Sequence, residues 1–485
     1  MDKETMRHWL TKQAELAPEQ LAVEADGHVS LTFLELQTES EAYAKKLVHI
    51  GVKKGTRVAM LATNNVDFVR TVFALSYVGA VVVLLNVRLT NEELTYQLEQ
   101  SKSELVITTE QLREEKQLDI KKQLTFQELR SLPEANVTVR TEISLAEPFT
   151  MMFTSGTTGK PKAVVHTYGN HWWSAIASVL NLGLTDHDKW LLPLPLFHVG
   201  GLSILFRSVI YGMPFYLVER YEKCHVFDVI HEKEITIASF VTLMLRDFLE
   251  QLGDAPFPEH VRTILLGGGS VPETLLDEVR CKEVPLFLSY GMTETSSQIV
   301  TLHKKDIFHK LGSAGKPLFP AQLKIANDDE DGVGEIYVKG PMVIERYAND
   351  VSANEKSFHD GWLKTGDLGY VDEDGFLFVV DRRSDLIISG GENIYPTEVE
   401  NALMSIDGVS EAAVVGRNDE KWGQVPVAFI VLEVGTSLSE EKIKAQLADK
   451  LASYKLPRAF YFIDSLPRNA ANKVMRHKLK ERLVP

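Results

Sequence analysis

A short run of hydroxyl-bearing residues, glycines and lysines, Phe153–Lys162 (FTSGTTGKPK), is chemically suited to holding a polyphosphate. Small residues let backbone N–H groups approach phosphate oxygens, hydroxyls add further donors, and lysines supply positive charge. The run is not the P-loop of ordinary NTPases, in which four residues separate the glycines and Ser or Thr follows the lysine. Here two residues separate Gly156 from Gly159, and Pro161 follows Lys160. The run predicts a phosphate-binding loop of another class; a flexible surface turn is the alternative.

Composition limits the kinds of protein that could carry this loop. The chain has 485 residues, which is too long for one compact core, so two or more domains are expected. With 44% hydrophobic and 25% charged residues it is typical of an ordinary soluble globular protein. The net charge of -15 argues against nucleic acid as a partner, because such a partner requires a basic surface. Anionic small-molecule substrates must therefore meet local positive charge, and a homo-oligomer is compatible with the composition.

The cysteines and apolar segments suggest a cytoplasmic protein. Cys224 and Cys281 lack metal-ligand spacing, and we expect both to be buried as small hydrophobic residues in a reducing compartment. The N-terminal residues lack the apolar core of a signal peptide. The longest apolar run, Val72–Leu85, is short for a membrane span. It predicts the end of a buried helix, a turn at Gly79 and a core strand over Ala80–Leu85, so no membrane insertion is expected.

The elements that must position the loop alternate between strands and helices. Arg57–Leu61, Glu104–Thr108 and Ile264–Leu266 have the pattern of buried strands, with helical patterns before or between them. Such alternation predicts mostly parallel sheets covered by helices, with ligands collecting beyond the carboxyl ends of the strands. The glycine triplet Gly267–Gly269 follows one of these strands. Between residues 312 and 380, short β-rich pieces alternate with Gly/Asp turns, which indicates a β-rich subdomain.

The last hundred or so residues have the pattern of a separate α+β domain. Helices are predicted over Thr397–Met404 and Ser439–Leu451, and strands over Glu411–Val415 and Val427–Leu432. We therefore predict an α/β protein with a β-rich subdomain. Its large N-terminal domain covers residues 1–383, with parallel sheets and helices, and its small C-terminal α+β domain covers residues 384–485.

Further motifs follow the loop in an order that identifies a family. They are Tyr290–Glu294 (YGMTE), Thr365–Asp367 (TGD), Asp381–Arg383 (DRR), Ser389–Glu400 (SGGENIYPTEVE) and Pro467–Lys473 (PRNAANK). One such string is weak evidence, but the ordered set covers nearly the whole chain. The chain resembles the adenylate-forming superfamily, which includes acyl-CoA synthetases, luciferases and the adenylation domains of peptide synthetases. The resemblance implies the corresponding fold, with a mobile C-terminal lid that turns on a hinge at Ser384 and Asp385.

The chemistry implied by the resemblance is activation of a carboxylate. A carboxylate is a poor electrophile because its leaving group would be oxide, so AMP is transferred from ATP to form a mixed anhydride. A thiol then attacks this acyl-adenylate. The implied substrates are an acid, ATP and CoA, with Mg²⁺ bridging the phosphates. Preorganised donors and cations are the expected catalysts, because negative charge develops on the α-phosphate and the departing pyrophosphate.

The resemblance assigns the nucleotide site to residues from several motifs. Glu294 is the expected Mg²⁺ ligand, since this ion prefers one or two carboxylates together with phosphate oxygens. Asp367 is expected to accept the ribose hydroxyls, and Arg382 to contact the ribose or phosphate side. Lys160 and Lys162 are expected at the β- and γ-phosphates. The remaining ATP-binding candidates are Thr154, Ser155, Gly156, Thr157, Thr158, Gly159, Gly268, Ser289, Tyr290, Gly291, Met292 and Thr293, with Tyr290 offering a stacking face.

Lys473 is the expected mobile catalytic lysine. A compact ammonium on a flexible stem can reach both the acid carboxylate and the α-phosphate, although basic clusters of this kind are usually solvated surface. For the second step, the resemblance places His198 near the acyl pocket and the thiol channel as an aromatic gate. A core histidine is the equally plausible alternative. Residues Ser389, Gly390, Gly391 and Glu392 are expected to contact CoA.

The segments Asn170–Gly183, Pro193–Ser203 and Asp381–Asn393 resemble the branch of the superfamily that activates o-succinylbenzoate in menaquinone biosynthesis. This acid has two carboxylates, and the one that is not activated must be held as an anion, which is costly without a cation. Arg207 can supply that charge, unless it is a helix arginine facing solvent. Ser203, one turn earlier, can add a hydrogen bond. Gly269 and Gln298 complete the predicted acid pocket.

Other readings of the same motifs remain open. Within the class, the acid could be a simple benzoate or a medium-chain fatty acid, for which a pocket cation would be wasteful. Outside it, a luciferase-type oxygenase also uses an acyl-adenylate. A silent adenylate-binding protein is the third alternative, although it would have no use for a mobile lysine.

Overall fold

The structure is a computed structural model that describes residues 5–120, 122–154, 161–267, 271–326, 332–382, 385–389, 392–419, 422–448, 450–451, 453–469 and 473–483. The described residues form two compact units. The first contains the residues up to Thr154 together with Pro161–Leu323 and Val338–Leu363. The second contains the described residues of Lys324–Tyr337 and Lys364–Pro485. The predicted boundary between residues 383 and 384 lies within the second unit, so the position of the hinge stays a prediction.

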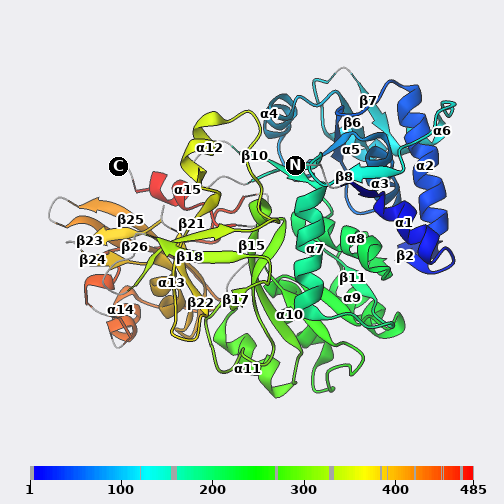
Figure 1. The fold of residues 1–485 in the computed structure, drawn as a ribbon. Coiled ribbons are helices and arrows are strands. Elements are labelled where there is room, and N and C mark those ends of the chain that lie inside the picture. Colours follow the sequence, from blue (N-terminus) through cyan, green and yellow to red (C-terminus); the bar gives the residue numbers. More distant parts are fainter. Residues whose placement is uncertain are drawn as a thin grey trace. The chain divides into compact units, whose positions relative to one another are not determined.

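The first unit is built on two large sheets whose central strands are parallel, as the alternating pattern predicted (Figure 1). One has the order β10 (Ala163–Thr167), β9 (Pro148–Phe153), β5 (Val81–Leu84), β4 (Arg57–Leu61), β6 (Leu105–Thr108) and β7 (Gln123–Thr125). The other has the order β17 (Lys316–Pro317), β16 (Ser297–Leu302), β15 (Leu286–Met292), β14 (Thr263–Leu266), β13 (Ile237–Phe240), β11 (Trp190–Leu192), β12 (Phe215–Leu217), β2 (Leu21–Ala25) and β3 (Val29–Thr32). A small ribbon joins β1 (Thr5–Arg7) to β8 (Glu142–Ser144).

Helices pack against these sheets. They are α1 (Trp9–Leu16), α2 (Phe33–His49), α3 (Val66–Val78), α4 (Asn91–Ser101), α5 (Glu110–Glu115), α6 (Phe126–Ser131), α7 (Tyr168–Leu182), α8 (Val199–Tyr211), α9 (Lys223–Glu232), α10 (Thr242–Leu252), α11 (Glu273–Cys281) and α12 (Val351–Ser357). The predicted helix, turn and strand around Gly79 are confirmed, because α3 ends at a left-handed Gly79 and β5 follows. Glycine suits this turn because it has no Cβ to clash in that conformation.

Hydrogen bonds of a single residue, Asn170, fix the start of α7. At the start of α7, Thr167 accepts the Asn170 N–H, and Asn170 accepts the Thr167 N–H in return. The Asn170 amide also donates to the carbonyls of Pro341 and Val343, at 2.9 and 3.1 Å. This one residue therefore both caps the helix and ties it to the segment before Ile344.

The second unit contains most of the predicted β-rich sheet and all of the C-terminal sheet. The first of these includes β18 (Gln322–Ala326), β19 (Gly334–Lys339), β21 (Trp362–Val371), β20 (Phe358–His359) and β22 (Leu377–Arg382). The second has the order β24 (Glu392–Ile394), β23 (Ile387–Ser389), β26 (Gly423–Leu432) and β25 (Val409–Asp419), with β27 (Phe460–Phe462) beside β26. Its helices are α13 (Pro396–Met404), α14 (Glu440–Ala448) and α15 (Arg476–Glu481).

The C-terminal sheet has a core on each face. Val414 and Ile430 belong to one apolar cluster with residues of α13 and α14, whereas Val415 and Phe429 belong to another that includes Leu479 of α15. Side chains that alternate along β25 and β26 supply both clusters, since successive residues of a strand point to opposite faces. The prediction of an α+β C-terminal part is confirmed.

The expected burial of the two cysteines is wrong. Cys224 and Cys281 are both free and exposed. Each lies at the end of a helix, and the buried face of α11 is formed by Leu275, Leu276 and Val279 instead. A residue two positions after Val279 lies off that face because the helical repeat is 3.6 residues. Among the residues described, no helix is both long enough and apolar enough to cross a membrane.

Candidate active site

The predicted phosphate loop joins two antiparallel strands. β9 ends at Phe153 and β10 begins at Ala163, and these two residues are paired. The Thr154 N–H donates to the Lys162 carbonyl at 3.0 Å, so these two residues close the base of the loop. Ser155, Gly156, Thr157, Thr158, Gly159 and Lys160 lie outside the described residues, and their phosphate contacts stay predictions.

Tyr347 joins the base of this loop to Glu294. The Lys162 Nζ lies 4.7 Å from the centroid of the Tyr347 ring, and the Tyr347 hydroxyl donates to Glu294 Oε1 at 3.0 Å. Burial, and then the Glu294 carboxylate, raise the pKa of Tyr347, so the phenol keeps the proton that it donates. The Ile344 N–H also donates to the Glu294 carbonyl at 2.9 Å. A carboxylate held beside a lysine in this way fits the chemistry of a Mg²⁺–phosphate site.

The Tyr290–Glu294 motif forms a hairpin. β15 contains Ser289, Tyr290, Gly291 and Met292, and a short 3₁₀ turn over Thr293–Thr295 leads into β16. A Cβ on Gly291 would lie 2.1 Å from the Ser297 carbonyl oxygen, so no side chain fits there. The Ser289 hydroxyl donates to the Leu266 carbonyl at 3.0 Å, beside the end of β14. The glycines predicted to continue from that end, Gly268 and Gly269, lie outside the described residues.

The turn after Glu294 is held in an unusual backbone conformation. Ser296 and Ser297 have φ angles of 55° and 111°, which non-glycine residues rarely adopt. The Ser174 hydroxyl donates to the Ser296 carbonyl at 2.7 Å, and the Ser296 hydroxyl donates to the Met342 carbonyl at 2.8 Å. These buried hydrogen bonds fix the turn that connects Glu294 to the strand with Gln298.

Two buried histidines form a hydrogen-bonded chain that ends at Thr293. His166 Nε2 lies 2.7 Å from the Thr293 carbonyl, which can only accept, so Nε2 carries the hydrogen. His166 Nδ1 is then an acceptor for the Thr150 hydroxyl at 3.1 Å, and that hydroxyl accepts from His171 Nε2 at 2.8 Å. Burial lowers the pKa of His166 to about 4, so the ring is neutral at neutral pH. The Thr293 carbonyl therefore determines which atom donates and which accepts in each hydrogen bond between His166, Thr150 and His171.

Ser203 and Arg207, the predicted acid-binding residues of α8, both contact Ser297. Arg207 Nη2 lies 3.3 Å and Ser203 Oγ 3.5 Å from Ser297 Oγ. Arg207 is 1% exposed, so it is not the solvent-facing arginine that was the alternative. Arg207 Nε has no hydrogen-bond partner among the described residues, and the same holds for Nε2 of Gln298, the buried residue after Ser297. Burial lowers the pKa of the Arg207 guanidinium, and in the described part of the chain Arg207 makes no ion pair.

His198 lies at the N-cap of α8, before Ser203 and Arg207 on the same helix. Its ring packs edge-on against Phe197, with centroids 4.8 Å apart, and it is partly exposed. It is therefore not a fully buried core histidine. Its role as a gate stays a prediction.

In the second unit, Asp367 and Arg382 lie opposite each other. Their Cα atoms are partners across the antiparallel pair of β21 and β22. Asp367 is 6% exposed, and its N–H donates to Thr365 Oγ1 at 3.1 Å. The strand pairing thus brings together two residues that are fifteen positions apart in the sequence, and their shared role at the ribose stays a prediction.

The other predicted residues of the second unit lie in turns. Lys473 is exposed, and its N–H donates to Asn469 Oδ1 at 2.9 Å while its carbonyl accepts the Asn469 N–H at the same distance. Ser389 is paired with Glu392 across the hairpin of β23 and β24, and Gly390 and Gly391 lie outside the described residues. No group of three or more His, Cys, Asp or Glu side chains suited to a metal occurs among the residues that the structure describes.

Four residues of this site were missed by the sequence reasoning: Tyr347, Ser297, His166, and Trp190, whose ring centroid lies 5.4 Å from Arg207 Cζ. Ser297 follows the Tyr290–Glu294 motif closely, and its proximity to that motif could have drawn attention to it. Tyr347 and His166 lie far from the Glu294 motif in the sequence, and Trp190 lies on a different element from Arg207. None of the three carries a motif of its own, so the fold brings them to the site.

Comparison with known proteins defines the class. The family model "AMP-binding enzyme" matches residues 10–348, and the model of the AMP-binding enzyme C-terminal domain matches residues 398–473. The chain belongs to the AMP-binding enzyme family, and the adenylate-forming fold is confirmed. It is 50% identical to the 2-succinylbenzoate–CoA ligase of Oceanobacillus iheyensis over 480 residues, which cover 98% of this chain and 99% of that protein.

Solved structures agree with this relationship. o-Succinylbenzoate coenzyme A synthetase (MenE) from Bacillus subtilis, in complex with ATP and magnesium ion, matches with a TM-score of 0.94 and 45% identity. The match covers 98% of this chain and 100% of that chain. The same B. subtilis enzyme in complex with the acyl-adenylate intermediate OSB-AMP has a TM-score of 0.93, also at 45% identity, with 98% of each chain covered.

Proposed function

We propose that this protein activates 2-succinylbenzoate (o-succinylbenzoate) with ATP and transfers the acyl group to CoA. The products are 2-succinylbenzoyl-CoA, AMP and diphosphate, and the reaction belongs to menaquinone biosynthesis. Membership of the AMP-binding family supports the reaction type. The relatives named 2-succinylbenzoate–CoA ligase support the acid. The observation that carries the choice of acid in this chain is the buried Arg207, which makes no ion pair among the described residues.

In the first half-reaction, an oxygen of the succinyl carboxylate attacks the α-phosphorus of ATP and diphosphate leaves. Lys160, Lys162 and the loop hydroxyls would stabilise the charge that develops on diphosphate. Lys473 would hold the attacking carboxylate against the α-phosphate, so that less of the barrier is orientational entropy. Glu294 would hold Mg²⁺, which supplies charge stabilisation between the phosphates. Asp367 and Arg382 would hold the ribose.

In the second half-reaction, the CoA sulfur bonds to the activated carbonyl carbon, and the bond from that carbon to the AMP oxygen breaks. The sulfur loses its proton and AMP leaves as the anion. Ser389 and Glu392, in the hairpin of β23 and β24, are proposed to contact CoA, and His198 to gate the channel. A lid movement about residues 384–385 and a cytoplasmic location both stay predictions.

The buried Arg207 supports an acid with a second carboxylate on physical grounds. A buried guanidinium is costly, and the cost falls when a carboxylate accepts hydrogen bonds from it. Arg207 Nε and Gln298 Nε2, which have no partner in the described part of the chain, are donors of the kind that a carboxylate satisfies. An uncharged alkyl chain or an unsubstituted benzoate would leave these donors without partners, which is why such acids are the weaker alternatives.

Pyrophosphate–ATP exchange without CoA tests this proposal directly. We expect o-succinylbenzoate to support exchange, and benzoate and octanoate to support little or none. Exchange with benzoate or octanoate instead would show that o-succinylbenzoate is not the substrate, but it would leave the proposed reaction type unchanged. Release of the CoA thioester without oxygen uptake would exclude a luciferase-type oxygenase. No exchange with any of these acids, together with retained nucleotide binding, would favour a silent adenylate-binding protein.

The histidine chain gives a prediction for the nucleotide side of the site. His166→Asn keeps an acceptor near Thr150 but loses the donor to the Thr293 carbonyl, whereas His166→Gln can keep that donor. Because an unsatisfied buried acceptor costs about 1–3 kcal/mol and loosens the segment before Glu294, we expect His166→Asn to raise the KM for ATP about tenfold. Exchange assays at varied ATP concentration measure this.

The matched His166→Gln variant is the control for this prediction. We expect it to have a KM for ATP much closer to that of the unaltered protein. Equal KM values for ATP in the two variants, with equal melting temperatures, would show that the bond to Thr293 does not position the motif.

A further inference from the structure

Arg207 is held by an aromatic ring. Its Cζ lies 5.4 Å from the centroid of the Trp190 ring, within the range of a cation–π contact. Trp190 begins β11, is 1% exposed, and donates from Nε1 to Ser239 Oγ at 2.9 Å. The indole is thus fixed by the sheet on its polar edge, and it presents a fixed surface to the guanidinium.

A ring face differs from a carboxylate as a partner for this cation. A carboxylate beside Arg207 would neutralise it and compete with the acid substrate for the same N–H groups. An indole attracts the cation through its quadrupole and accepts none of the in-plane hydrogen bonds that a bidentate carboxylate needs. Among the described residues, the side chain of Arg207 has two polar contacts: the cation–π contact with Trp190 and a 3.3 Å hydrogen bond to Ser297. It makes no ion pair with any of them. The arrangement compensates part of the burial cost while leaving the donors for a ligand.

We propose that Trp190 is a positioning residue that determines acid specificity, because it holds the Arg207 guanidinium ready for the carboxylate of the acid that is not activated. This inference rests on the proposed function, since it requires an acid with a spare carboxylate.

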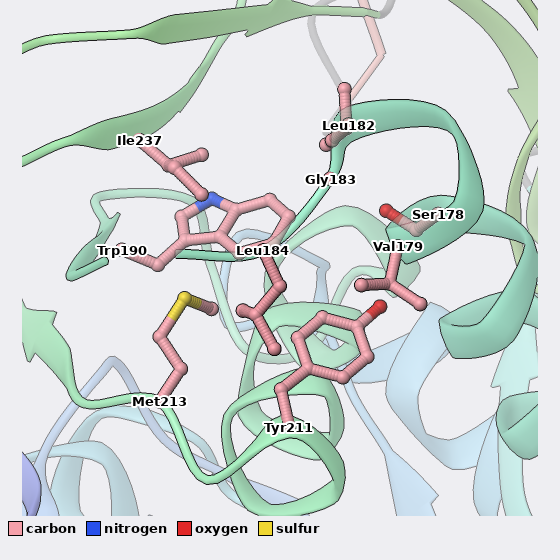
Figure 2. A pocket seen from close by; sticks show the side chains of 9 residues that line it. All are labelled: Ser178, Val179, Leu182, Gly183, Leu184, Trp190, Tyr211, Met213 and Ile237. Atoms are coloured by element: carbon pink, nitrogen blue, oxygen red, sulfur yellow. The ribbon is translucent and has the colours of Figure 1, made fainter. Parts of the chain in front are cut away.

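The indole also borders a small pocket, which makes the inference testable (Figure 2). Figure 2 shows the Trp190 ring among Ile237, Met213 and Leu184. While the indole is in place, the residues that line the pocket leave no room for even a water molecule. Leu184, at its edge, is 47% exposed, so the pocket reaches the surface. If the indole is removed by substitution, a small aromatic molecule can enter from this side and occupy the vacated space.

The experiment compares Trp190→Leu, Trp190→Phe and Trp190→Ala in the full chain, with Ile237→Ala as a control that alters the pocket at a residue other than Trp190. We expect Trp190→Leu to raise the KM for o-succinylbenzoate roughly 5- to 30-fold, the range that loss of a desolvated cation–π contact corresponds to. The KM for ATP should stay within about twofold. Trp190→Phe keeps an aromatic face and should show a much smaller rise. Ile237→Ala should leave the KM for the acid unchanged.

Rescue by added indole is a second measurement. If Trp190 had a purely structural role, indole would not change the KM for the acid. In Trp190→Ala, we expect indole at millimolar concentration to lower the KM for o-succinylbenzoate toward that of the unaltered protein, and cyclohexane to have no such effect. Equal KM values for the acid in Trp190→Leu and Trp190→Phe, both folded by melting temperature, would overturn the inference. If the unaltered protein does not use o-succinylbenzoate, the proposed function fails instead, so the two failures are distinguishable.

Discussion

Lys473→Ala should abolish formation of the acyl-adenylate while largely sparing thiol attack on an acyl-adenylate that is supplied. A preorganised cation aimed at the developing charge is worth roughly 10²–10³ in rate, and the proposed lysine acts only in the first half-reaction. Its backbone is fixed by paired hydrogen bonds with Asn469, so the substitution should remove the ammonium without disturbing the turn. Pyrophosphate–ATP exchange measures the first step, and thioester formation from supplied acyl-adenylate measures the second.

Lys478→Ala is the matched control. Lys478 is exposed on α15, five positions further along the same basic segment, and is not assigned to the site. We expect this variant to keep both half-reactions. Equal losses in the two half-reactions of Lys473→Ala would contradict the assignment, because they would indicate damage to the fold or to a shared step.

Arg207→Leu should raise the KM for o-succinylbenzoate about 30-fold or more, with a much smaller change in the KM for ATP. Truncating one member of a buried, hydrogen-bonded charge pair costs about 2–5 kcal/mol, because the remaining charge is left unpaired. The leucine fits the surroundings, since Arg207 lies between the buried Phe206 and Ser208 of an otherwise largely apolar helix. Exchange assays at varied acid and varied ATP concentrations separate the two effects.

Arg207→Lys and Arg280→Leu complete this test. The lysine keeps the charge but loses the planar pair of donors, so an intermediate KM for the acid is expected. Arg280 is an exposed residue of α11, and its replacement should leave both KM values unchanged. An unchanged acid dependence in Arg207→Leu would remove Arg207 from the acid site, whatever the outcome at Lys473.

Much of the fold was predictable because the central strands are buried on both faces. β4 and β14 read as short apolar runs, and the pattern located both strands to within a residue. Gly79 marked the end of α3 because a left-handed turn favours glycine. The cysteines were misjudged because a single residue type is a weak guide to burial. The side of a helix that faces the core depends on its neighbours, such as Val279, and on the sheet against which it packs.

The functional residues could be predicted only where they lie in contiguous sequence motifs. The run from Tyr290 to Glu294 and the Thr-Gly-Asp of Asp367 are examples. Contacts across the fold have no such signature. Tyr347 reaches Glu294 because the segment before Ala348 pairs with the start of β10, and Trp190 reaches Arg207 because β11 and α8 pack together. Tertiary packing selects these partners, and a single sequence does not reveal which helix covers which strand.

The left-handed backbone conformation of Ser296 and Ser297 affects how the protein could evolve. A non-glycine residue in this backbone region costs about 1–3 kcal/mol, and glycine at position 297 would relieve that cost. Glycine would also remove the hydroxyl that lies between Ser203 and Arg207. Folding stability alone would therefore favour Ser297→Gly, whereas binding of the acid favours serine at this position. Under selection for thermal stability without selection for this acid, position 297 is where we expect substrate discrimination to be lost first.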